Sequence, residues 1–462
     1  MENIIIIGSG PSGGRFAAQL TRAGYSCTML EAGRKFTSKE FPLSELDGSA
    51  KLYWGGGIEL STDAKLAFLR AKCVGGTSIV NQALLDEFDD NAWDDWRDRS
   101  GIKDLGTSTY KPYYSKVASD LSIQPIEDRY FNKNTKVFVD AFTKNGLGYS
   151  RLNRGQKDCA LDSGNDCMAC LCGCPRNSKQ SSMVTGITTA ESKGMTLKTE
   201  FEVTDLIHSN DGVTVRGIQR GQKRELKAKR VVLAAGSFGS TQIMLRSGFK
   251  SQLPALGKGI TAHPQFMTYA FYDSPIDAHK GAFQAVKSYD PALRKRGLKL
   301  ENVFAAPIAT SMLFSGMGKE HLARMKKYRY VASMEVAIRD ENSGTLDVDK
   351  NGKLIIKKSM TDVDWAKVHD GLDLVKNLFH SVNARETEAC MQVFGLHLMG
   401  GCALGSDPKT SVVDPEFKVH GLKNITIADS SVFPSAPGIN PSYTIMALSE
   451  KASENIIKGG RS

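Results

Sequence analysis

The chain has 462 residues, of which 41% are hydrophobic and 24% are charged. These values are close to the averages of globular proteins and exclude a disordered or collagen-like chain. Its 60 basic and 50 acidic residues give a net charge of +10, which favours acidic partners or anionic ligands. No nucleic-acid motif accompanies this charge, and no apolar run approaches the roughly 18 residues that span a bilayer. We therefore expect a globular protein with no nucleic-acid partner and no integral membrane segment.

The chain begins with the pattern of a nucleotide-binding unit. A run of isoleucines at residues 4–7 predicts a parallel strand buried on both faces. The glycine-rich turn GSGPSG occupies residues 8–13, a helix is expected over residues 14–23, and a second strand is expected over residues 26–30. Glu31 directly follows this strand. A strand, a glycine-rich turn, a helix and a spaced acidic residue together predict binding of a dinucleotide, FAD or NAD.

The three glycines of this turn and Glu31 each have a physical role in binding a dinucleotide. Gly8 permits the tight turn, Gly10 lets the backbone approach a pyrophosphate, and Gly13 lets the helix pack against the strand. The N-terminus of the helix stabilises the phosphate charge. Glu31 is placed to accept hydrogen bonds from the adenosine ribose, and its charge disfavours the 2′-phosphate of NADP.

A second glycine pair follows later. Gly75 and Gly76 precede Thr77 and Ser78, and Asn81 comes shortly after them. Adjacent glycines allow close approach of the backbone to a ligand and offer N–H donors to an anion. The alternative interpretation is an ordinary helix N-terminus capped by Thr77 or Ser78.

Further pieces of the same sheet are expected near the middle and the end of the chain. A strand is expected over residues 230–235, and Gly236 begins the helix after it. Near the C-terminus, a short strand at residues 425–428 is followed by Asp429 and then by a helix over residues 444–458. Because both ends of the chain supply such elements, the nucleotide-binding domain is expected to be discontinuous.

The middle of the chain has a different pattern of apolar and polar residues. Residues 331–340 and 345–357 alternate apolar and polar side chains and are bounded by Asn and Gly turns, which predicts antiparallel strands. We therefore expect an α/β fold with a discontinuous Rossmann-type domain formed by residues 1–264 and 391–462. Into it is inserted an α+β substrate domain, residues 265–390, built on an antiparallel sheet.

Four segments, taken in this order, resemble the glucose–methanol–choline (GMC) family of flavin oxidoreductases. They are GSGPSG with Glu31, VGGTSIVN at residues 74–81, GSFGSTQIMLRSG at residues 236–248, and the C-terminal stretch that begins HLMGGCALG at His397 and continues over residues 412–457. The last segment is most similar to the cholesterol-oxidase-like branch. The resemblance implies an FAD enzyme that oxidises an alcohol such as a sugar, a polyol or a sterol-like alcohol, with hydride passing from carbon to flavin N5.

The resemblance also implies the residues that hold FAD. It gives the adenine a backbone contact at Val203, the ribityl chain a contact at Asp429, and the flavin ring contacts at Asn440 and Pro441. The full set of expected FAD contacts is Gly8, Gly10, Gly13, Glu31, Gly75, Gly76, Ser78, Asn81, Val203, Gly236, Asp429 and Pro441.

His397 and Asn440 are the catalytic candidates, with His397 implied as the base. The unperturbed pKa of histidine, about 6.5, suits proton transfer near neutral pH, and an uncharged amide can both donate and accept hydrogen bonds to a hydroxyl. A lone histidine on an apolar strand is more often a core residue, but the following Gly400-Gly401 turn and the downstream Asn440-Pro441 pair favour catalysis.

Three other residues are weaker candidates for the same site. His263 precedes Pro264 at a position where relatives carry a similar turn, and its alternative is an ordinary loop residue. Glu335 and Glu341 are candidates for a carboxylate base, and the sequence does not choose between them.

Five of the nine cysteines lie within residues 159–174, and Pro175 follows them. Thiolates are soft ligands suited to an iron–sulfur cluster or zinc. The segment also resembles the cluster-binding segment of flavin sugar dehydrogenases, which implies Cys167, Cys170 and Cys174 as ligands of an Fe–S cluster. Zinc, metal-free thiols and a loop disulfide remain alternatives.

The expected electron acceptor depends on whether the protein binds an iron–sulfur cluster. With a cluster, the protein is expected to be a dehydrogenase that passes electrons to an external acceptor such as a cytochrome. The alternatives are an oxidase that reduces O₂ to hydrogen peroxide and, from another class, a flavoprotein that acts as a thiol redox sensor. The N-terminus carries no basic segment or cleavage site of a secretory signal. A cytoplasmic protein is therefore the default expectation, and co-export with a partner remains open.

Overall fold

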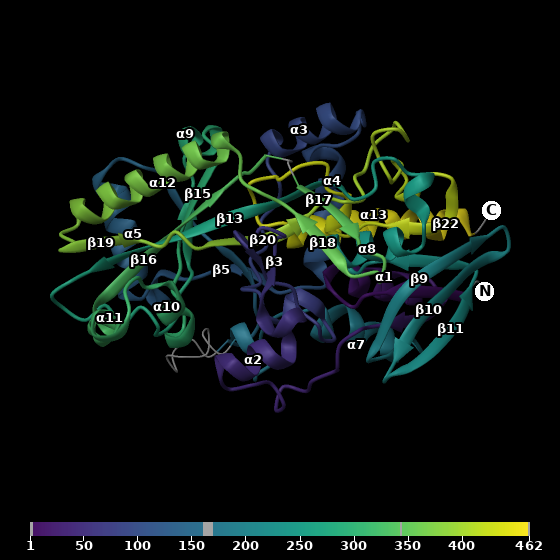
Figure 1. Cartoon of the computed structure of the whole chain (residues 1–462), viewed down its shortest axis with the longest axis horizontal. Helices are drawn as coiled ribbons and strands as arrows, with labels where there is room; N and C mark the ends of the chain where they lie inside the picture. Colours follow the sequence, from purple (N-terminus) through teal and green to yellow (C-terminus); the bar gives the residue numbers. More distant parts are fainter. Residues whose placement is uncertain (1–2, 160–169, 342–343, 461–462) are drawn as a thin grey trace.

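The computed structural model describes residues 3–159, 170–341 and 344–460. Its strands form two main sheets that lie side by side (Figure 1). Both ends of the chain lie at the outer edge of the half that contains the predicted nucleotide-binding turn. A three-stranded sheet and a two-stranded ribbon complete the strands of the described residues. Among these residues, no helix combines the length and apolar character needed to cross a membrane.

The first main sheet has six strands in the order β21-β22-β12-β1-β2-β8. They are β1 (Asn3–Ile7), β2 (Ser26–Leu30), β8 (Thr196–Lys198), β12 (Arg230–Leu233), β21 (Lys418–Val419) and β22 (Leu422–Ile427). The strands from β22 to β8 are parallel, and β21 joins β22 antiparallel. Ile4 to Ile7 are almost fully buried, as expected for a central parallel strand.

Helices connect these strands as the sequence predicts. In the described residues they are α1 (Pro11–Arg22), α2 (Glu45–Leu52), α3 (Asp90–Ser100), α4 (Thr107–Ser119), α5 (Lys133–Lys144), α7 (Thr188–Ser192), α8 (Gly236–Arg246), α9 (Pro291–Lys295), α10 (Pro307–Leu313), α11 (Gly318–Lys326), α12 (Asp362–Ser381) and α13 (Ser442–Gly459). The helices α1 and α8 directly follow β1 and β12, and α13 packs against α1. The predicted Rossmann-type α/β arrangement is therefore confirmed.

The second main sheet is largely antiparallel, as the alternating pattern predicts. Its central path is β3-β4-β20-β13-β16-β15-β14-β6, with β17 and β19 also paired to β13 and with β18 paired to β17. The strands are β3 (Glu59–Leu60), β4 (Leu66–Phe68), β6 (Tyr149–Arg151), β13 (Lys258–Phe271), β14 (Val286–Ser288), β15 (Leu298–Asn302), β16 (Val331–Ile338), β17 (Gly344–Val348), β18 (Leu354–Lys357), β19 (Glu386–Ala389) and β20 (Val393–Met399). The smaller sheets contain β9 (Phe201–Ser209), β10 (Gly212–Gln219) and β11 (Gln222–Ala228), and β5 (Ile123–Pro125) with β7 (Asn153–Gly155).

The long strand β13 runs through the predicted domain boundary between residues 264 and 265. Its first half pairs with β20 and its second half with β16. The sheet also takes β3, β4 and β6 from the range expected for the nucleotide domain. The two predicted domains therefore share one sheet, and a continuous hydrogen-bonded ladder joins them.

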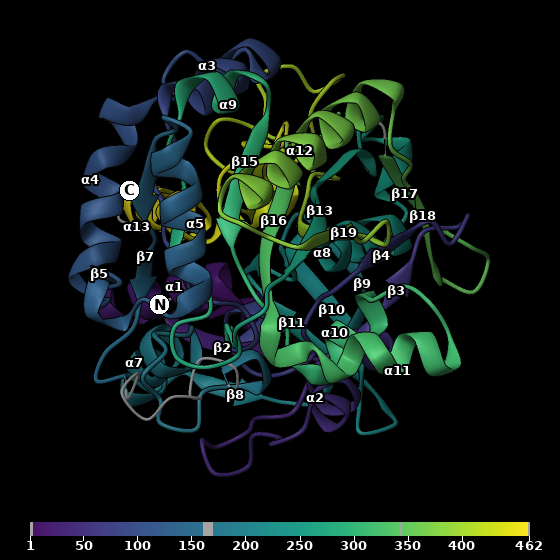
Figure 2. The same ribbon diagram turned by 90° about the vertical axis from the view of Figure 1, so that its left-hand side faces the viewer.

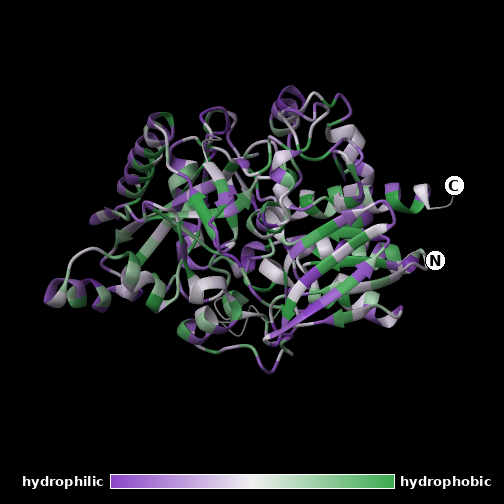
Figure 3. Cartoon of the chain, turned by 45° about the vertical axis from the view of Figure 1, so that its right-hand side comes forward, coloured by the Kyte–Doolittle hydropathy of each residue, from purple (hydrophilic) through white to green (hydrophobic). Residues whose placement is uncertain are grey.

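One face of this sheet is covered by α12. Figure 2 shows α12 and α5 in front of β15 and β16. An added Cβ at Gly371 of α12 would lie 2.5 Å from Cγ1 of Val336, so the helix sits directly on this face. Successive strand residues point to opposite faces, and Glu335 and Ala337 therefore point to the other side of the sheet. Figure 3 shows green and purple alternating along the outer helices, and green segments in the interior of the molecule.

Gly371→Ala is expected to lower the free energy of unfolding by about 1–3 kcal/mol, because the added methyl group overpacks the contact with Val336. The measurement is the midpoint of urea denaturation. Gly459→Ala in α13 is the matched control, since an added Cβ there meets nothing within 4 Å. Equal midpoints for the two variants would contradict close packing of α12 on β16.

Candidate active site

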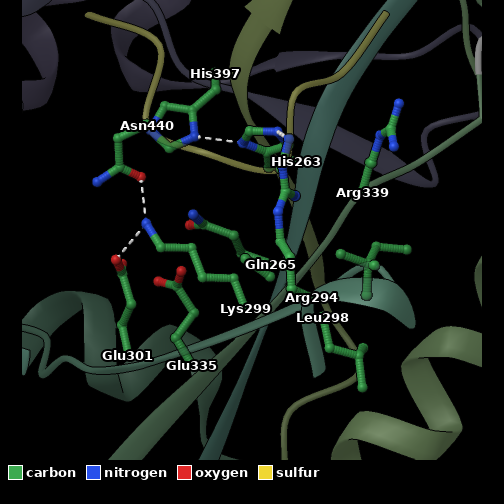
Figure 4. Close-up of a pocket in the computed structure, with 14 residues that line it drawn as sticks. His263, Gln265, Arg294, Leu298, Lys299, Glu301, Glu335, Arg339, His397 and Asn440 are labelled. Atoms are coloured by element: carbon green, nitrogen blue, oxygen red, sulfur yellow. Dashed lines mark hydrogen bonds and ion pairs between the residues drawn. The ribbon is translucent and has the colours of Figure 1, made fainter. Parts of the chain in front are cut away.

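A small cavity lies on the face of the large sheet opposite α12. Its lining comes mainly from strands β13, β15, β16 and β20, with Arg294 from α9 and with Gly438 and Asn440 from the segment before α13. Figure 4 shows its polar residues converging from these elements, and they are His263, Gln265, Arg294, Lys299, Glu301, Glu335, Arg339, His397 and Asn440. The sheet and the C-terminal segment thus bring the two predicted catalytic residues together.

His397 reaches the cavity through an irregularity in β20. Thr261 pairs with Met399 and His263 with Leu396, so that two residues of β20, His397 and Leu398, lie opposite one residue of β13. Such a β-bulge changes the direction of a side chain. The backbone of His397 has a φ of 57°, which is uncommon for a residue with a side chain and is often found at functional sites.

The glycine pair that follows His397 is required by close packing. A Cβ at Gly400 would lie 2.0 Å from the carbonyl oxygen of Gly259, and a Cβ at Gly401 would lie 2.2 Å from Oγ1 of Thr241. Both glycines have positive φ values, 82° and 102°. The Gly-Gly turn therefore holds the end of β20 against α8 and the start of β13, and it fixes the position of the bulge.

His263 and His397 form a hydrogen-bonded pair across β13 and β20. Their Nδ1 atoms are 2.9 Å apart, and the N–H of Gly438 donates to Nε2 of His263 over 3.0 Å. Since Nε2 of His263 is an acceptor, the neutral His263 ring carries its proton on Nδ1 and donates it to His397. In this arrangement the neutral His397 ring holds its own proton on Nε2.

Both rings are neutral at physiological pH. Burial, and next the positive charge of Lys299, lower the pKa of His397 from 6.5 to about 3. Burial also lowers the pKa of His263 well below 6.5, with further contributions from His397, Lys299 and the two arginines that line the cavity. A neutral imidazole can accept a proton, so the pair can take part in proton transfer at neutral pH.

The amide of Asn440 is held in one orientation by Lys299. The ammonium of Lys299 donates to Oδ1 of Asn440 over 2.8 Å and lies 2.6 Å from a carboxylate oxygen of Glu301. The Nδ2 atom of Asn440 is buried and has no hydrogen-bond partner among the described residues. Asn440 therefore offers a fixed hydrogen-bond donor that the protein itself does not use.

Two glutamates lie next to this lysine. Glu301 and Glu335 are directly paired across β15 and β16, and both are buried. Burial, and next the charge of Glu301, raise the pKa of Glu335 to about 8. Glu335 is therefore a protonated carboxylic acid at neutral pH, while Glu301 forms the ion pair with Lys299. The other candidate glutamate, Glu341, pairs with Lys367 away from the cavity lining.

The predicted dinucleotide turn has the expected geometry. Gly8 has a φ of 98°, and a Cβ there would lie 2.4 Å from the carbonyl oxygen of Ala234. A Cβ at Gly13 would lie 2.0 Å from the carbonyl oxygen of Gly8. Beside Gly10, by contrast, an added Cβ would meet nothing within 4 Å. The backbone at Gly10 thus borders open space at the start of α1, which fits the approach of a pyrophosphate.

The second glycine segment lies against this turn. A Cβ at Gly76 would lie 2.8 Å from the Cα of Gly10, and the N–H of Gly75 donates to Oγ of Ser9 over 3.0 Å. The carboxylate of Glu31 accepts from the N–H and the hydroxyl of Ser9 and from the N–H of Gly33. Glu31 therefore connects the end of β2 to both glycine segments.

Several other predicted FAD contacts bond mainly to the protein. The hydroxyl of Ser78 donates to the carbonyl of Gly75 and accepts from the N–H of Ser182, and Asn81 accepts from the N–H of Ala83. These contacts shape the second glycine loop. Their role toward FAD stays a prediction.

Asp429 and Gly236 are joined in the structure. One carboxylate oxygen of Asp429 accepts from the N–H of Gly236 and the hydroxyl of Ser240, and the other accepts from Ser431. The bonds tie the start of α8 to the turn after β22. Val203 lies in β9, the edge strand of its sheet, and Pro441 directly precedes α13.

Comparison with known proteins identifies the family. A family model described as GMC oxidoreductase matches residues 49–265, and a second one with the same description matches residues 342–449, together more than half of the chain. The chain belongs to the GMC oxidoreductase family. The family and its FAD-dependent structural neighbours support FAD as the cofactor, and the open cradle at Gly10 and the unused Nδ2 of Asn440 fit it.

GMC relatives cover nearly the whole chain at low identity. An uncharacterized GMC-type oxidoreductase of Sinorhizobium fredii is 26% identical over 97% of this chain and 93% of its own length. A long-chain-alcohol oxidase of Arabidopsis thaliana is 22% identical over 98% of this chain and 68% of its own length. The crystal structure of pyridoxine 4-oxidase from Mesorbium loti has a TM-score of 0.77 at 15% identity and covers 98% of this chain and 99% of that one. The structural likeness shows the shared GMC fold.

The described part of the cysteine segment does not support the predicted iron–sulfur cluster. Cys170 and Cys174 are buried and hydrogen-bonded to each other, and that bond is the first cause of the lowered pKa of Cys174, about 5. The buried ammonium of Lys179 donates to the carbonyl of Cys170 and to two carbonyls of the second glycine loop. In the ranges 3–159, 170–341 and 344–460, no group of three or more His, Cys, Asp or Glu is arranged to hold a metal ion. Cys167, the third predicted ligand, lies outside these ranges, and the iron–sulfur cluster is without support.

Sequence reasoning missed Lys299 and Glu301. Their segment, residues 298–302, alternates apolar and polar residues, which is the usual pattern of a strand with one solvated face. The available signal was that two opposite charges occupy the same face two residues apart. Only the packing shows that this face borders a cavity.

Lys299→Met is expected to raise the pKa of His397 from its depressed value, because a positive charge is removed while burial remains. The measurement is a pH titration of histidine ring signals by NMR. Lys287→Met is the matched control, since it removes a lysine that pairs with Asp86 on the same sheet face. An unchanged His397 titration in Lys299→Met would contradict the electrostatic link.

The depressed pKa also sets the sign of a stability change. The unfolded protein binds a proton at His397 below pH 6.5, whereas the folded protein binds it only near pH 3, so that the contribution of His397 to stability falls as the pH is lowered between these values. Lys299→Met should narrow this pH window.

Gly10→Ala is expected to fold normally but to bind FAD at least tenfold more weakly, because the methyl group enters the open cradle without touching the protein. The measurements are FAD content after purification and the thermal stability of the FAD-free protein. Gly13→Ala is the comparison, since its Cβ clashes with Gly8 and should destabilise the fold itself. Full FAD retention in Gly10→Ala would place the cofactor elsewhere.

Proposed function

We propose that this protein oxidises an alcohol to a carbonyl compound with FAD as the bound redox cofactor. The observation that carries the proposal is the neutral His263–His397 pair beside an anchored Asn440, whose Nδ2 bonds to none of the residues that the structure describes. When bound, the flavin supplies the acceptor for the hydride that leaves the alcohol carbon. The chain's own residues then have to orient the hydroxyl and take up its proton.

Asn440 and His397 divide these tasks. The Nδ2 of Asn440 donates a hydrogen bond to the hydroxyl oxygen, and its amide cannot rotate freely because Lys299 holds Oδ1. His397 accepts the hydroxyl proton on Nε2. Because this nitrogen must first be free, the proton of His397 has to reside on Nδ1 and that of His263 on Nε2, which breaks the bond from Gly438. Loss of one buried hydrogen bond costs about 1–3 kcal/mol, an amount that substrate binding can offset.

The electron acceptor has two candidates. Relatives named as long-chain-alcohol oxidase, cholesterol oxidase and pyridoxine 4-oxidase support O₂ as the acceptor. An external acceptor such as a cytochrome rests on the predicted cysteine cluster. Alcohol oxidation in air with one hydrogen peroxide formed per carbonyl product is expected for an oxidase. Slow reoxidation by O₂ together with fast reoxidation by an artificial acceptor is the outcome expected for a dehydrogenase.

A thiol redox sensor is the second candidate function, and the hydrogen-bonded pair of Cys170 and Cys174 favours it. This function would survive loss of the histidine pair and would depend on the thiols. Reversible oxidation of the thiols in Cys170→Ser, measured by alkylation and mass spectrometry, tests it: an unaltered response would remove the pair from that role.

His397→Ala is expected to lower the rate of flavin reduction by an alcohol by about 10²–10⁴-fold, the usual contribution of a positioned general base, while FAD remains bound. Anaerobic stopped-flow absorbance of the flavin measures this rate. His369→Ala removes an exposed histidine of α12 and is the control. Full activity of His397→Ala would refute the assignment of His397 as the base.

A further inference from the structure

The cavity face of the large sheet carries polar side chains in two rows. In the first row Gln265 of β13 and Lys299 of β15 both pair with Ala337 of β16. In the second row Glu335 of β16 pairs with Glu301 of β15. The opposite face is apolar and lies under α12, where Val336 and Leu298 face Gly371. Polar residues thus occupy the side of the sheet that borders the cavity.

Glu335 carries a buried oxygen atom that the described residues leave without a hydrogen bond. Its side chain is 5% exposed, and its Oε1 atom forms no hydrogen bond with any described residue. An unsatisfied polar group of this kind costs about 1–3 kcal/mol. Since Glu335 is protonated at neutral pH, its carboxyl group offers one donor and one acceptor, as a hydroxyl group does.

The remaining charges of the cavity are neutralised in pairs. Arg294 forms a two-pronged contact with Asp89, Arg339 pairs with Asp95, and Lys299 pairs with Glu301. Both arginines also donate to backbone carbonyls, those of Pro437 and Ala436. With Glu335 protonated, these charges sum to zero. The cavity is therefore suited to a neutral polar molecule rather than to an anion or a cation.

The rows also have a direction. Figure 4 shows Lys299 between Asn440 on one side and the two glutamates on the other. Asn440 is the residue that orients the reacting hydroxyl in the proposed function. Rows separated by two residues along a strand lie about 7 Å apart, which is the scale of a compact molecule with several hydroxyl groups.

We propose that Glu335 binds a second hydroxyl group of the substrate, remote from the carbon that is oxidised, and that the substrate is a neutral polyhydroxy alcohol such as a polyol or sugar. This inference rests on the proposed alcohol oxidation and specifies its substrate class. A long-chain alcohol or a sterol would cover Glu335 and Gln265 with apolar atoms and leave their hydrogen bonds unmade. The loss of about 1–3 kcal/mol for each buried polar group corresponds to a roughly 5- to 150-fold weaker interaction.

The first experiment compares alcohols on the unmodified FAD-loaded protein. The probes are sorbitol, D-glucose and myo-inositol as polyhydroxy alcohols, hexan-1-ol, dodecan-1-ol and cholesterol as apolar alcohols, and 6-aminohexan-1-ol as a cationic one. The measurement is kcat/KM for anaerobic flavin reduction. We expect the best polyhydroxy alcohol to exceed every apolar and cationic alcohol by at least tenfold. A higher value for an apolar or cationic alcohol overturns the substrate class but leaves alcohol oxidation intact, whereas no reduction by any alcohol overturns the proposed function.

The second experiment tests Glu335 itself with the best polyhydroxy alcohol. Glu335→Leu should narrow the ratio of kcat/KM between that alcohol and hexan-1-ol by at least tenfold, and it should weaken binding of that alcohol to the oxidised protein, measured by calorimetry. Glu335→Gln keeps one donor and one acceptor without charge and should preserve most of the ratio. If Glu335→Leu does not fold, the Gln variant decides: a lost ratio shows that a carboxylate is needed and overturns the proposal. Glu341→Gln is the matched control, since Glu341 lies outside the cavity lining. A change of the kcat/KM ratio in Glu341→Gln as large as the change in Glu335→Leu would also overturn the proposal.

Discussion

The ammonium of Lys299 connects the two parts of the cavity, and the rest of the site depends on it. It fixes the amide of Asn440 on one side, forms an ion pair with Glu301 on the other, and contributes to the low pKa of His397. The side chain of Lys299 is partly buried, and a charge withdrawn from water needs such partners because an unpaired one is destabilising. The candidate catalytic residues and the polar rows of the sheet are therefore connected through Lys299, and the position of each group is set by its neighbours.

The large sheet gives this network its precision. His263 and His397 meet because β13 and β20 are neighbours and because β20 contains a bulge at His397. Gly438 completes the pair from the C-terminal segment, where a Cβ would lie 2.3 Å from Nη1 of Arg294. Groups held on strands are placed more accurately than groups on loops. A sheet that extends through both predicted domains thus fixes the histidine pair relative to the polar rows.

Membership in the family bears on the cofactor and the reaction, whereas the cavity lining bears on the choice of substrate. Membership in the GMC family supports FAD and oxidation of an alcohol, and several named relatives act as oxidases of apolar alcohols. Substrate choice resides in the side chains that line the cavity, because one fold can carry sites of very different chemistry. In this chain polar and charged residues outnumber the apolar ones in the lining, and this lining differs from one suited to a lipid.

The sequence by itself determined the nucleotide-binding half and the two catalytic candidates. The isoleucine run, the glycine turn and Glu31 are local patterns whose spacing alone specifies a strand, a turn and a helix. His397 and Asn440 became candidates through the resemblance of their segments to the GMC family. The antiparallel strands in the middle of the chain were also predictable from the alternation of apolar and polar residues.

Only the tertiary structure decided which polar residues belong to the site. Lys299 and Glu301 have the alternation of a solvated strand, and Glu335 could not be distinguished from Glu341 by sequence. Their roles depend on strand pairing between residues far apart in the chain and on the contact of Lys299 with Asn440, 141 residues away. Burial then removes the usual negative charge of Glu335 and keeps both histidines neutral. Local sequence cannot contain this information, because a pKa and a hydrogen-bond partner are properties of the folded surroundings.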